Sequence, residues 1–132
     1  MTRLLDASAI FRAIKENAID RTAESHTLEL ARYELGNIVW KQHNLHKTIN
    51  REESLSLIRV IADVLDTLQI HHVKGKEASI LELAEETDTT FYDASYIHHA
   101  RELGLPLVSE DKGIIEKARQ TRITASTLTE IL

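Results

Sequence analysis

The sequence predicts an α/β fold in which short apolar strands alternate with longer helices around a central, mostly parallel sheet. Three features of the 132 residues indicate this fold. Helix-like segments repeat apolar residues every three or four positions, the apolar runs between them are too short for helices, and no repeat or Gly- or Pro-rich linker divides the chain. A single domain over residues 1–132 is therefore expected, large enough to bury one core.

The chain is expected to open with a strand followed by two helices. Leu4-Leu5 is a brief apolar strand, and the segment 7–17 is helix-like. The pattern over 26–42 is also helical, because its apolar residues recur on one face. That face carries Leu28, Ala31, Leu35, Ile38 and Val39.

The middle of the chain predicts a capped helix and a second strand. Asn50 is expected to cap a helix over 51–68, and Glu53 stands where the acid of a capping box belongs. The apolar run LQIHHV at 68–73 is typical of a short strand, and the turn 74–76 follows it.

The last third of the chain repeats the alternation of helix and strand. Gly104 and Pro106 are expected to stop one of its helices. Helices are expected over 78–87, 92–103, 111–120 and 127–132. Strands are expected over 105–109 and, in the segment RITAS, over 122–126.

The composition limits where the protein works and what chemistry it uses. At 42% hydrophobic and 28% charged residues, it falls in the range of ordinary soluble domains. The absence of cysteine excludes disulfides, thiolate catalysis and Cys-ligated zinc, and it fits a reducing compartment. No apolar stretch reaches the roughly 20 residues of a membrane span, and the N-terminus lacks the apolar region of a signal peptide. We expect a cytoplasmic protein without a membrane partner.

The formal net charge of −5 argues against binding of nucleic acid by bulk charge. A polyanion would need a bound cation or a local basic patch, and two patches are candidates. One is Lys41, His43, His46, Lys47 and Arg51, and the other is Lys112, Lys117 and Arg119. The alternative is a solvated helix end favoured by the helix dipole. No platform of aromatic residues for stacking bases is evident, so contacts to a nucleic-acid backbone are expected instead.

Two acids directly follow predicted strands. Asp6 comes after Leu4-Leu5, and Asp111 comes after the strand 105–109. In parallel sheets the ligands bind beyond the carboxyl ends of the strands, so both acids are candidates for a site. An aspartate at such a junction is also a good helix N-cap, which is the alternative for each.

Two further acids have less distinctive settings. Asp93 lies on the wheel with Ile97 and Ala100 and so points towards the apolar face, although Thr90 and Asp93 also have the spacing of a capping box. Glu34 lies at the edge of the apolar stripe of its helix, and its alternative is a solvated surface glutamate.

The four acids together predict a metal site. A parallel sheet would bring Asp6 and Asp111 to one edge, near the start of the helix that carries Asp93. Two unit charges about 4 Å apart repel by about 4 kcal/mol at an effective dielectric constant of about 20, so such a cluster needs protonation or a cation. Oxygen ligands without cysteine favour Mg²⁺ or Mn²⁺, and such a site suits phosphodiester hydrolysis.

Four segments carry these residues: LLDASAIF, ARYELGNIVWK, FYDASYIHHARELGLPLVSEDKGI and RITAS. In them the chain resembles the PIN-domain nucleases, particularly the small VapC-like toxin ribonucleases. The resemblance implies a three-layer α/β/α domain with four to five short strands. It also implies that Asp6, Glu34, Asp93 and Asp111 are the catalytic and metal-binding acids, supported by Ser8, Asn37 and Ser109.

The resemblance further implies an activity and its partners. It implies a Mg²⁺- or Mn²⁺-dependent endoribonuclease that uses a metal-activated water, and Lys41 and Lys112 are the candidate RNA-binding residues. It also implies the toxin of a VapBC-type pair, a VapB-like antitoxin and a homodimer. The alternatives are a non-catalytic PIN-like module that binds RNA or protein and, less consistent with a single acid after the first strand, a receiver-like phosphoacceptor.

The histidines suggest another alternative, which is zinc binding or metal-free acid–base cleavage of RNA. Adjacent histidines on a strand or helix diverge, so neither His71-His72 nor His98-His99 is expected to chelate. We expect ordinary, partly exposed histidines. The exposed side of Trp40 is expected either to pack locally or to meet a partner.

Overall fold

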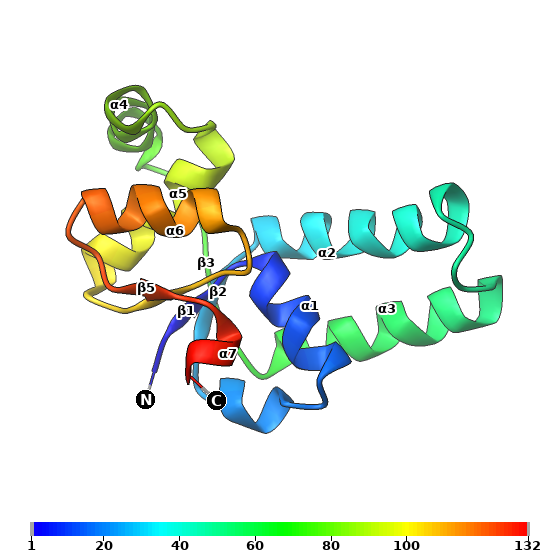
Figure 1. The fold of residues 1–132 in the computed structure, drawn as a ribbon. Coiled ribbons are helices and arrows are strands. Elements are labelled where there is room, and N and C mark those ends of the chain that lie inside the picture. The colour runs from blue at the N-terminus through cyan, green and yellow to red at the C-terminus, as the bar shows by residue number, and fades with distance from the viewer. Residues whose placement is uncertain (1, 132) are drawn as a thin grey trace.

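A fully parallel sheet of very short strands forms the centre of the computed structural model, which describes residues 2–131 (Figure 1). The strands in this part of the chain are β1 (Leu4–Leu5), β2 (His26–Leu28), β3 (Gln69–His71), β4 (Leu107–Val108) and β5 (Ala125–Ser126). Their order across the sheet is β3-β2-β1-β4-β5, and each neighbouring pair is parallel. The predicted α/β class is confirmed.

The strands separate two hydrophobic cores because successive side chains point to opposite faces of a strand. Leu4 and Leu107 belong to one core, whereas Leu5 and Val108 belong to the other. The first core lies under α4 (Glu77–Thr87), α5 (Phe91–Leu103) and α6 (Lys112–Gln120). The second lies under α1 (Ala7–Lys15), α2 (Leu30–Trp40), α3 (Arg51–Asp66) and α7 (Leu128–Ile131). The fold is therefore a three-layer α/β/α sandwich.

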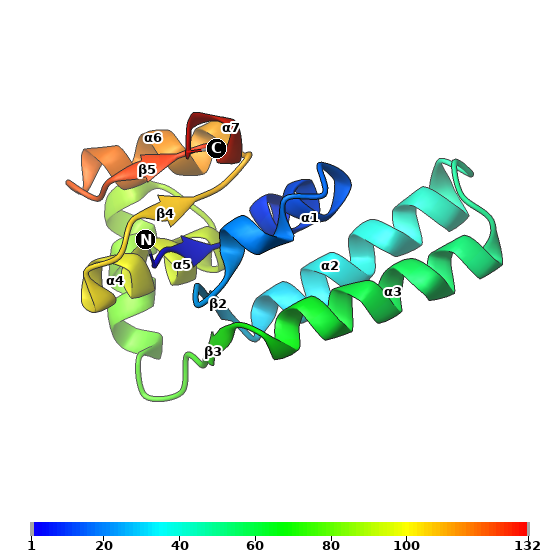
Figure 2. The same cartoon turned by 90° about the horizontal axis from the view of Figure 1, so that it is seen from below.

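Helices α2 and α3 run side by side and extend away from the sheet (Figures 1 and 2). A π-helical turn, Lys41–Leu45, continues α2 at the far end of this pair. The predicted capping box starts α3: Asn50 Oδ1 accepts a bond from the Glu53 amide at 2.8 Å, and Glu53 Oε1 accepts one from the Asn50 amide at 3.0 Å. No helix within residues 2–131 is long and apolar enough to cross a membrane.

The prediction of one helix over 26–42 was wrong at its start. His26–Leu28 is β2, and α2 begins only at Leu30. A three-residue strand is too short to show an alternating pattern, and Leu28 fitted the helical face as well. These residues form a strand because they pair with β1 on one side and with β3 on the other. The Thr27 hydroxyl also donates to the Leu5 carbonyl at 2.7 Å. The 3₁₀ turn Ile19–Thr22 was not expected either.

The other elements lie where they were expected, with ends that differ by a few residues. Gly104 ends α5 with a positive φ of 67°, a conformation in which a side chain is strained. The last predicted helix, 127–132, is present as α7, and its final residue lies outside the described part.

Candidate functional site

The register of two neighbouring strands brings Asp6 and Ser109 together. Leu5 is paired with Val108, so the next residue of each strand, Asp6 and Ser109, leaves the sheet at the same edge. The Asp6 amide donates to the Val108 carbonyl at 3.1 Å, which continues the pairing by one step. This edge is the carboxyl end of the strands, where α/β proteins bind their ligands.

The Asp6 carboxylate is buried and accepts three hydrogen bonds. Oδ1 accepts from the Ser8 hydroxyl at 2.7 Å and from the Ala9 amide at 2.9 Å, and Oδ2 accepts from the Ser109 hydroxyl. Burial raises the pKa of Asp6, while the bonds from Ser109, Ser8 and Ala9 lower it and the nearby charge of Asp111 raises it. The net effect is a raised pKa, which means that the folded protein opposes ionisation of Asp6.

The two acids that follow strands each cap a helix as well as reaching this edge of the sheet. Asp6 caps α1 through its bond from Ala9, and Asp111 caps α6 by accepting from the Gly113 amide at 2.8 Å. Both caps use Oδ1. An acid can therefore cap a helix and belong to the site at the same time. In Asp111, for example, Oδ2 takes no part in the cap.

Glu34 reaches the same region from α2 and is bonded to a residue that the sequence did not single out. The Tyr96 hydroxyl donates to Glu34 Oε1 at 2.7 Å, and the Tyr96 ring is buried. Burial raises the pKa of Glu34, Tyr96 lowers it, and the charges of Asp6 and Asp93 raise it further. Tyr96 lies three residues after Asp93 on the same helix face, and that spacing was the signal available for finding it.

Asp93 enters the region from the first turn of α5. Only half of the expected capping box is present: the Thr90 hydroxyl accepts a bond from the Asp93 amide at 3.1 Å. Within residues 2–131 the Asp93 carboxylate accepts no hydrogen bond, so it is available to a ligand. Burial raises the pKa of Asp93, and the charge of Asp111 raises it further.

These side chains line one cavity of about 250 Å³, which we call the acid cleft. Its lining contains all four predicted acids, and among the described residues it contains no histidine. It also contains the predicted Ser8, Asn37 and Lys41, together with Tyr96, Ala7 and Ile38. Ser109 is buried behind Asp6, and Lys112 lines a different cavity beside Arg119 and Glu130.

The acid cleft suits a hard divalent cation by its chemistry. Its acids are oxygen donors, and the pKa of Asp6, Glu34 and Asp93 is raised because burial and neighbouring charges oppose ionisation. A cation would relieve that repulsion. In the described part of the chain, no three Asp, Glu or His side chains yet converge as a complete ligand group.

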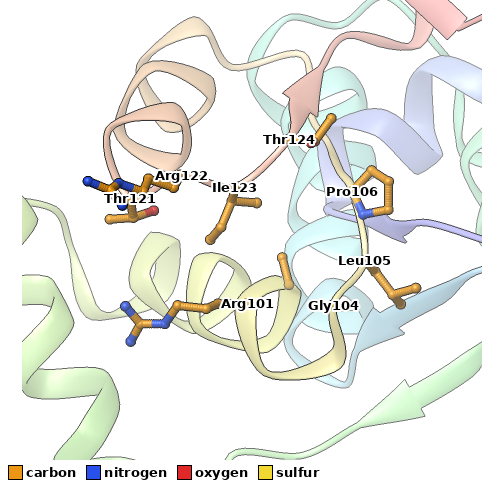
Figure 3. A pocket seen from close by; sticks show the side chains of 9 residues that line it. Arg101, Gly104, Leu105, Pro106, Thr121, Arg122, Ile123 and Thr124 are labelled. Carbon is orange, nitrogen blue, oxygen red and sulfur yellow. The ribbon is translucent and has the colours of Figure 1, made fainter.

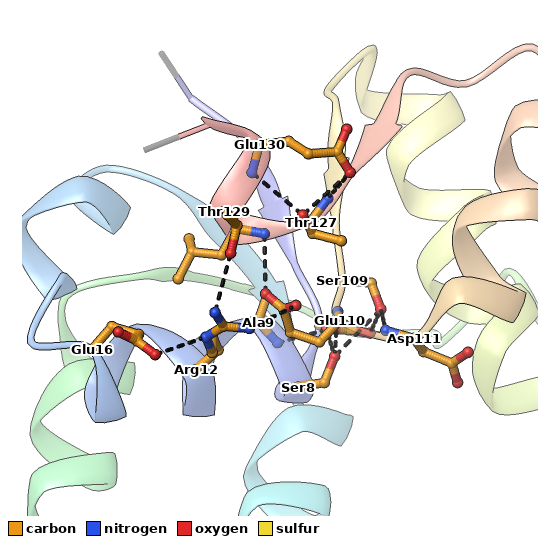
Figure 4. A network of polar contacts seen from close by, with 12 residues as sticks. Ser8, Ala9, Arg12, Glu16, Ser109, Glu110, Asp111, Thr127, Thr129 and Glu130 are labelled. Carbon is orange, nitrogen blue, oxygen red and sulfur yellow. Dashed lines mark hydrogen bonds and ion pairs between the residues drawn. The ribbon is translucent and has the colours of Figure 1, made fainter.

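A network around Arg12 supports the loop that follows β4 (Figure 4). Arg12 contacts Glu16 at 3.1 Å, Glu110 at 3.3 Å and the Thr129 hydroxyl at 3.1 Å. The Glu110 amide donates to the Ser8 hydroxyl at 2.9 Å. The network thereby links α1, α7 and the loop carrying Asp111. Local sequence patterns do not predict it, because its members are far apart in the chain.

A second cavity, of about 270 Å³, lies at the opposite end of the sheet (Figure 3). Arg101 and Arg122 border it, and it adjoins the residues that lead into β4 and β5. None of the predicted site residues lines it.

The histidines lie apart from the acid cleft, and two of them are more buried than expected. His98 and His99 are buried, so the expectation of partial exposure was wrong for this pair because α5 packs against the sheet and α4. His99 Nδ1 lies 2.7 Å from the Ser95 carbonyl. His26 Nδ1 lies 2.7 Å from His71 Nε2, and one of these nitrogens donates.

Acid is expected to weaken the fold through His98. Burial lowers the pKa of His98, as do His99, Arg101 and Lys76, while Glu102 raises it. Below pH of about 6.5 the unfolded chain binds a proton at His98 that the folded chain does not, so stability falls as the pH drops through that value. Urea unfolding should show a lower free energy of unfolding at pH 5.5 than at pH 7.5. In His98→Leu this difference should be smaller by up to about 1 kcal/mol.

The neighbouring His72 provides the control for this prediction. Its side chain is exposed, so His72→Gln should keep the pH dependence of the wild-type protein. An identical loss of stability in His98→Leu and in the wild-type protein would show that other groups cause the acid sensitivity.

Comparison with known proteins gives the family. Residues 3–120 match the PIN domain family. Ribonuclease VapC3 of Pyrobaculum aerophilum is 29% identical over 125 residues, which cover 89% of this chain and 95% of that protein. Exonuclease VapC9 of the same organism is 31% identical over 118 residues, with 88% and 85% covered.

Solved structures agree with this assignment. The crystal structure of PAE2754 from Pyrobaculum aerophilum superposes with a TM-score of 0.81 at 28% identity, over 99% of this chain and 95% of that one. VapBC2 from Rickettsia felis, bound to a DNA fragment from its promoter, gives a TM-score of 0.62 at 15% identity, over 96% and 98%, and shares the fold. The chain belongs to the PIN domain family, and its curated relatives within that family are VapC proteins.

Proposed function

We propose that this chain is a divalent-metal-dependent endoribonuclease, and that Asp6, Glu34, Asp93 and Asp111 are its catalytic acids. The observation that carries the proposal is the acid cleft itself, in which all four acids line one cavity at the carboxyl edge of the sheet. The VapC relatives are named ribonuclease and exonuclease, which supports the same reaction class. Only one of these names, exonuclease, says where on a chain the relative cuts, so the experiment below separates internal from terminal cleavage.

Asp6, Asp93 and Asp111 would hold Mg²⁺ or Mn²⁺, and such an ion, when bound, would polarise the scissile phosphate and lower the pKa of the attacking water. Each protein group has a distinct task. Ser8 and Ser109 fix the Asp6 carboxylate by donating to separate oxygens. The Tyr96 hydroxyl fixes Glu34 Oε1, and the other oxygen, Oε2, would accept a proton from water or bind the cation.

Two further groups are suited to the substrate. Both Asn37, one turn after Glu34 on α2, and Lys41, in the π-helical turn that continues α2, line the acid cleft. The Lys41 ammonium offers a positive charge to a backbone phosphate in a chain with a net charge of −5. Lys112 lines a different cavity, so any contact it makes would be with a more distant part of the RNA.

We also propose that the chain is the toxin of a VapBC-type pair, inhibited by a VapB-like antitoxin, and that it acts as a homodimer in the cytoplasm. These proposals rest on the likeness to VapC proteins. A small protein encoded beside this chain is expected to co-purify with it and to block its cleavage of RNA.

Circular single-stranded RNA is the substrate that tests the activity. With Mn²⁺ or Mg²⁺ the protein is expected to open the circle, because an endonuclease needs no chain end, and EDTA is expected to stop it. Cleavage of linear RNA alone would make the protein an exonuclease. Cleavage that persists in EDTA would refute the metal mechanism, and binding without cleavage under any metal would leave the non-catalytic module as the function.

A further inference from the structure

Two exposed tyrosines form a pocket beside the acid cleft. Tyr33 of α2 is 75% exposed and Tyr92 of α5 is 62% exposed, and both line a cavity of about 430 Å³. Its remaining lining is Leu30, Glu34 and Asn37. We call this cavity the tyrosine pocket, and its volume lies within the range of about 300–1,000 Å³ typical of small-molecule sites.

The tyrosine pocket and the acid cleft are continuous. Glu34 and Asn37 line both cavities. Each tyrosine also directly precedes a catalytic acid in the chain, Tyr33 before Glu34 and Tyr92 before Asp93. The helices that position the acids therefore position the two rings as well, so the pocket keeps a fixed relation to the reacting phosphate.

Folding makes little use of these two side chains. Within residues 2–131, neither the Tyr33 nor the Tyr92 hydroxyl makes a hydrogen bond, and neither ring belongs to a hydrophobic core. Large rings left in water contribute little to stability, but an exposed ring presents a face on which another flat group can stack. Their position beside the acids is thus better explained by a ligand than by the fold.

Charge favours a base over a phosphate in the tyrosine pocket. Glu34 forms part of its wall, and a phosphate would be repelled there, whereas a neutral base would not. Lys41 lies at the other side of the acid cleft and offers a positive charge to a phosphate. It is eight residues after Tyr33, which corresponds to about 12 Å along the helix axis. Stacking on aromatic rings adds affinity without positive charge, which suits a chain with a net charge of −5.

We propose that the tyrosine pocket holds one base of single-stranded RNA, next to the phosphate presented to the acids, by stacking it on Tyr33 and Tyr92. The inference rests on the proposed nuclease function and adds how the substrate is held. It differs from the expectation from the sequence, in which no aromatic platform was evident, because the two tyrosines are separated by 59 positions and only the fold brings them to one cavity.

The test measures binding without turnover. A single-stranded RNA containing 2-aminopurine is titrated with the Asp6→Asn protein, in which cleavage is removed but both tyrosines remain. Stacking is expected to quench the 2-aminopurine fluorescence. Adding Tyr33→Ala or Tyr92→Ala should remove the quenching and weaken binding about 5- to 150-fold, the range that stacking of one base supplies.

Matched variants separate stacking from other effects of the substitution. Phenylalanine at either position should keep the quenching, whereas leucine, which is apolar but not flat, should not. Trp40→Ala is the control, since Trp40 is an exposed aromatic residue on the same helix and lines neither cavity. An RNA with an abasic site in place of 2-aminopurine should bind the tyrosine and alanine proteins equally.

Failure of this inference can be told apart from failure of the proposed function. If the wild-type protein cleaves RNA but the alanine variants bind and quench as before, the pocket is not a base site. If those variants lose only a protein partner or self-association while RNA binding is unchanged, the tyrosines form a protein contact and the inference is wrong. Tyrosine-dependent quenching without any cleavage by the wild-type protein would support the pocket and refute the nuclease.

Discussion

Replacing Asp93 with asparagine is expected to lower RNA cleavage about 1,000-fold and, in metal-free buffer, to make the protein more stable. The loss of activity follows because a ligand to the proposed cation disappears, and metal ions supply several kcal/mol of transition-state stabilisation. The gain in stability follows because burial and Asp111 raise the pKa of Asp93. A raised pKa means that the folded state disfavours the ionised form, so removing the charge at neutral pH removes a cost.

The size of the stability gain is modest. Asp93 is only half-buried, so water screens its repulsion, and we expect about 1 kcal/mol or less, or about 2–4 °C in Tm. The side chain makes no hydrogen bond within residues 2–131 that asparagine would break. Asp6→Asn is a less clean test of this point, because its carboxylate accepts from Ser8, Ala9 and Ser109.

Added metal should reverse the order of stability. A ligand that binds only the folded protein stabilises it by about 2.7 kcal/mol at 100 times its Kd, so Mn²⁺ should raise the Tm of the wild-type protein well above that of Asp93→Asn. Thermal scans with EDTA and with Mn²⁺ measure both effects. Asp63→Asn is the control, since it removes the same charge from the exposed side of α3. A variant that is less stable than the wild-type protein in EDTA would contradict the repulsion argument.

Opposed effects of one substitution on activity and stability are what a functional cluster of acids produces. Three of the four acids have a raised pKa, and the network of Arg12 supports the surrounding backbone without neutralising them. The fold therefore holds together acids whose ionisation it opposes, and the proposed cation would supply the counter-charge.

The sequence predicted the parts of this molecule that depend on local pattern. The capping box of α3 and the stop at Gly104 need only neighbouring residues, and both are present. Strand β2 was missed because three residues carry no periodic signal, and only pairing with strands distant in sequence makes them a strand.

The site shows the same division. Asp6, Asp93 and Asp111 could be proposed because each stands at a recognisable place relative to a strand or a helix start, whereas Glu34 was proposed from its place on a helix stripe and from the family resemblance. Tyr96 was missed because a tyrosine on a buried helix face is usually a core residue, and only the tertiary fold brings its hydroxyl to Glu34, 62 positions away. Tyr33 and Tyr92 line one cavity only because of the tertiary fold, so their proximity could not be predicted from either segment alone.

Ser109→Ala is expected to weaken the binding of Mn²⁺ about 10- to 100-fold and to lower cleavage at limiting metal by a similar factor. Ser109 is buried, its hydroxyl donates to Asp6 Oδ2, and it accepts from the Asp111 amide at 3.0 Å. One side chain thus holds an oxygen of the first acid and the backbone of another. Groups that orient metal ligands in this way commonly have effects of that size.

The metal dependence of the cleavage rate distinguishes this positioning role from simple loss of the fold. If Ser109 only orients Asp6 and Asp111, a high concentration of Mn²⁺ should restore most of the activity of Ser109→Ala, since the ligands themselves are intact. The substitution should also cost about 1–3 kcal/mol of stability, because the Asp111 amide loses its buried acceptor.

Ser25→Ala is the matched control for Ser109→Ala. Ser25 is equally buried, but its hydroxyl has no hydrogen-bond partner among the described residues, so its removal is expected to leave stability unchanged or slightly improved. It lies at the start of β2, outside the lining of the acid cleft, so the Mn²⁺ dependence should match that of the wild-type protein. Equal metal affinity in Ser109→Ala and Ser25→Ala would mean that the hydroxyl of Ser109 stabilises the sheet edge alone, and that Asp6 keeps its orientation through Ser8 and the amide of Ala9.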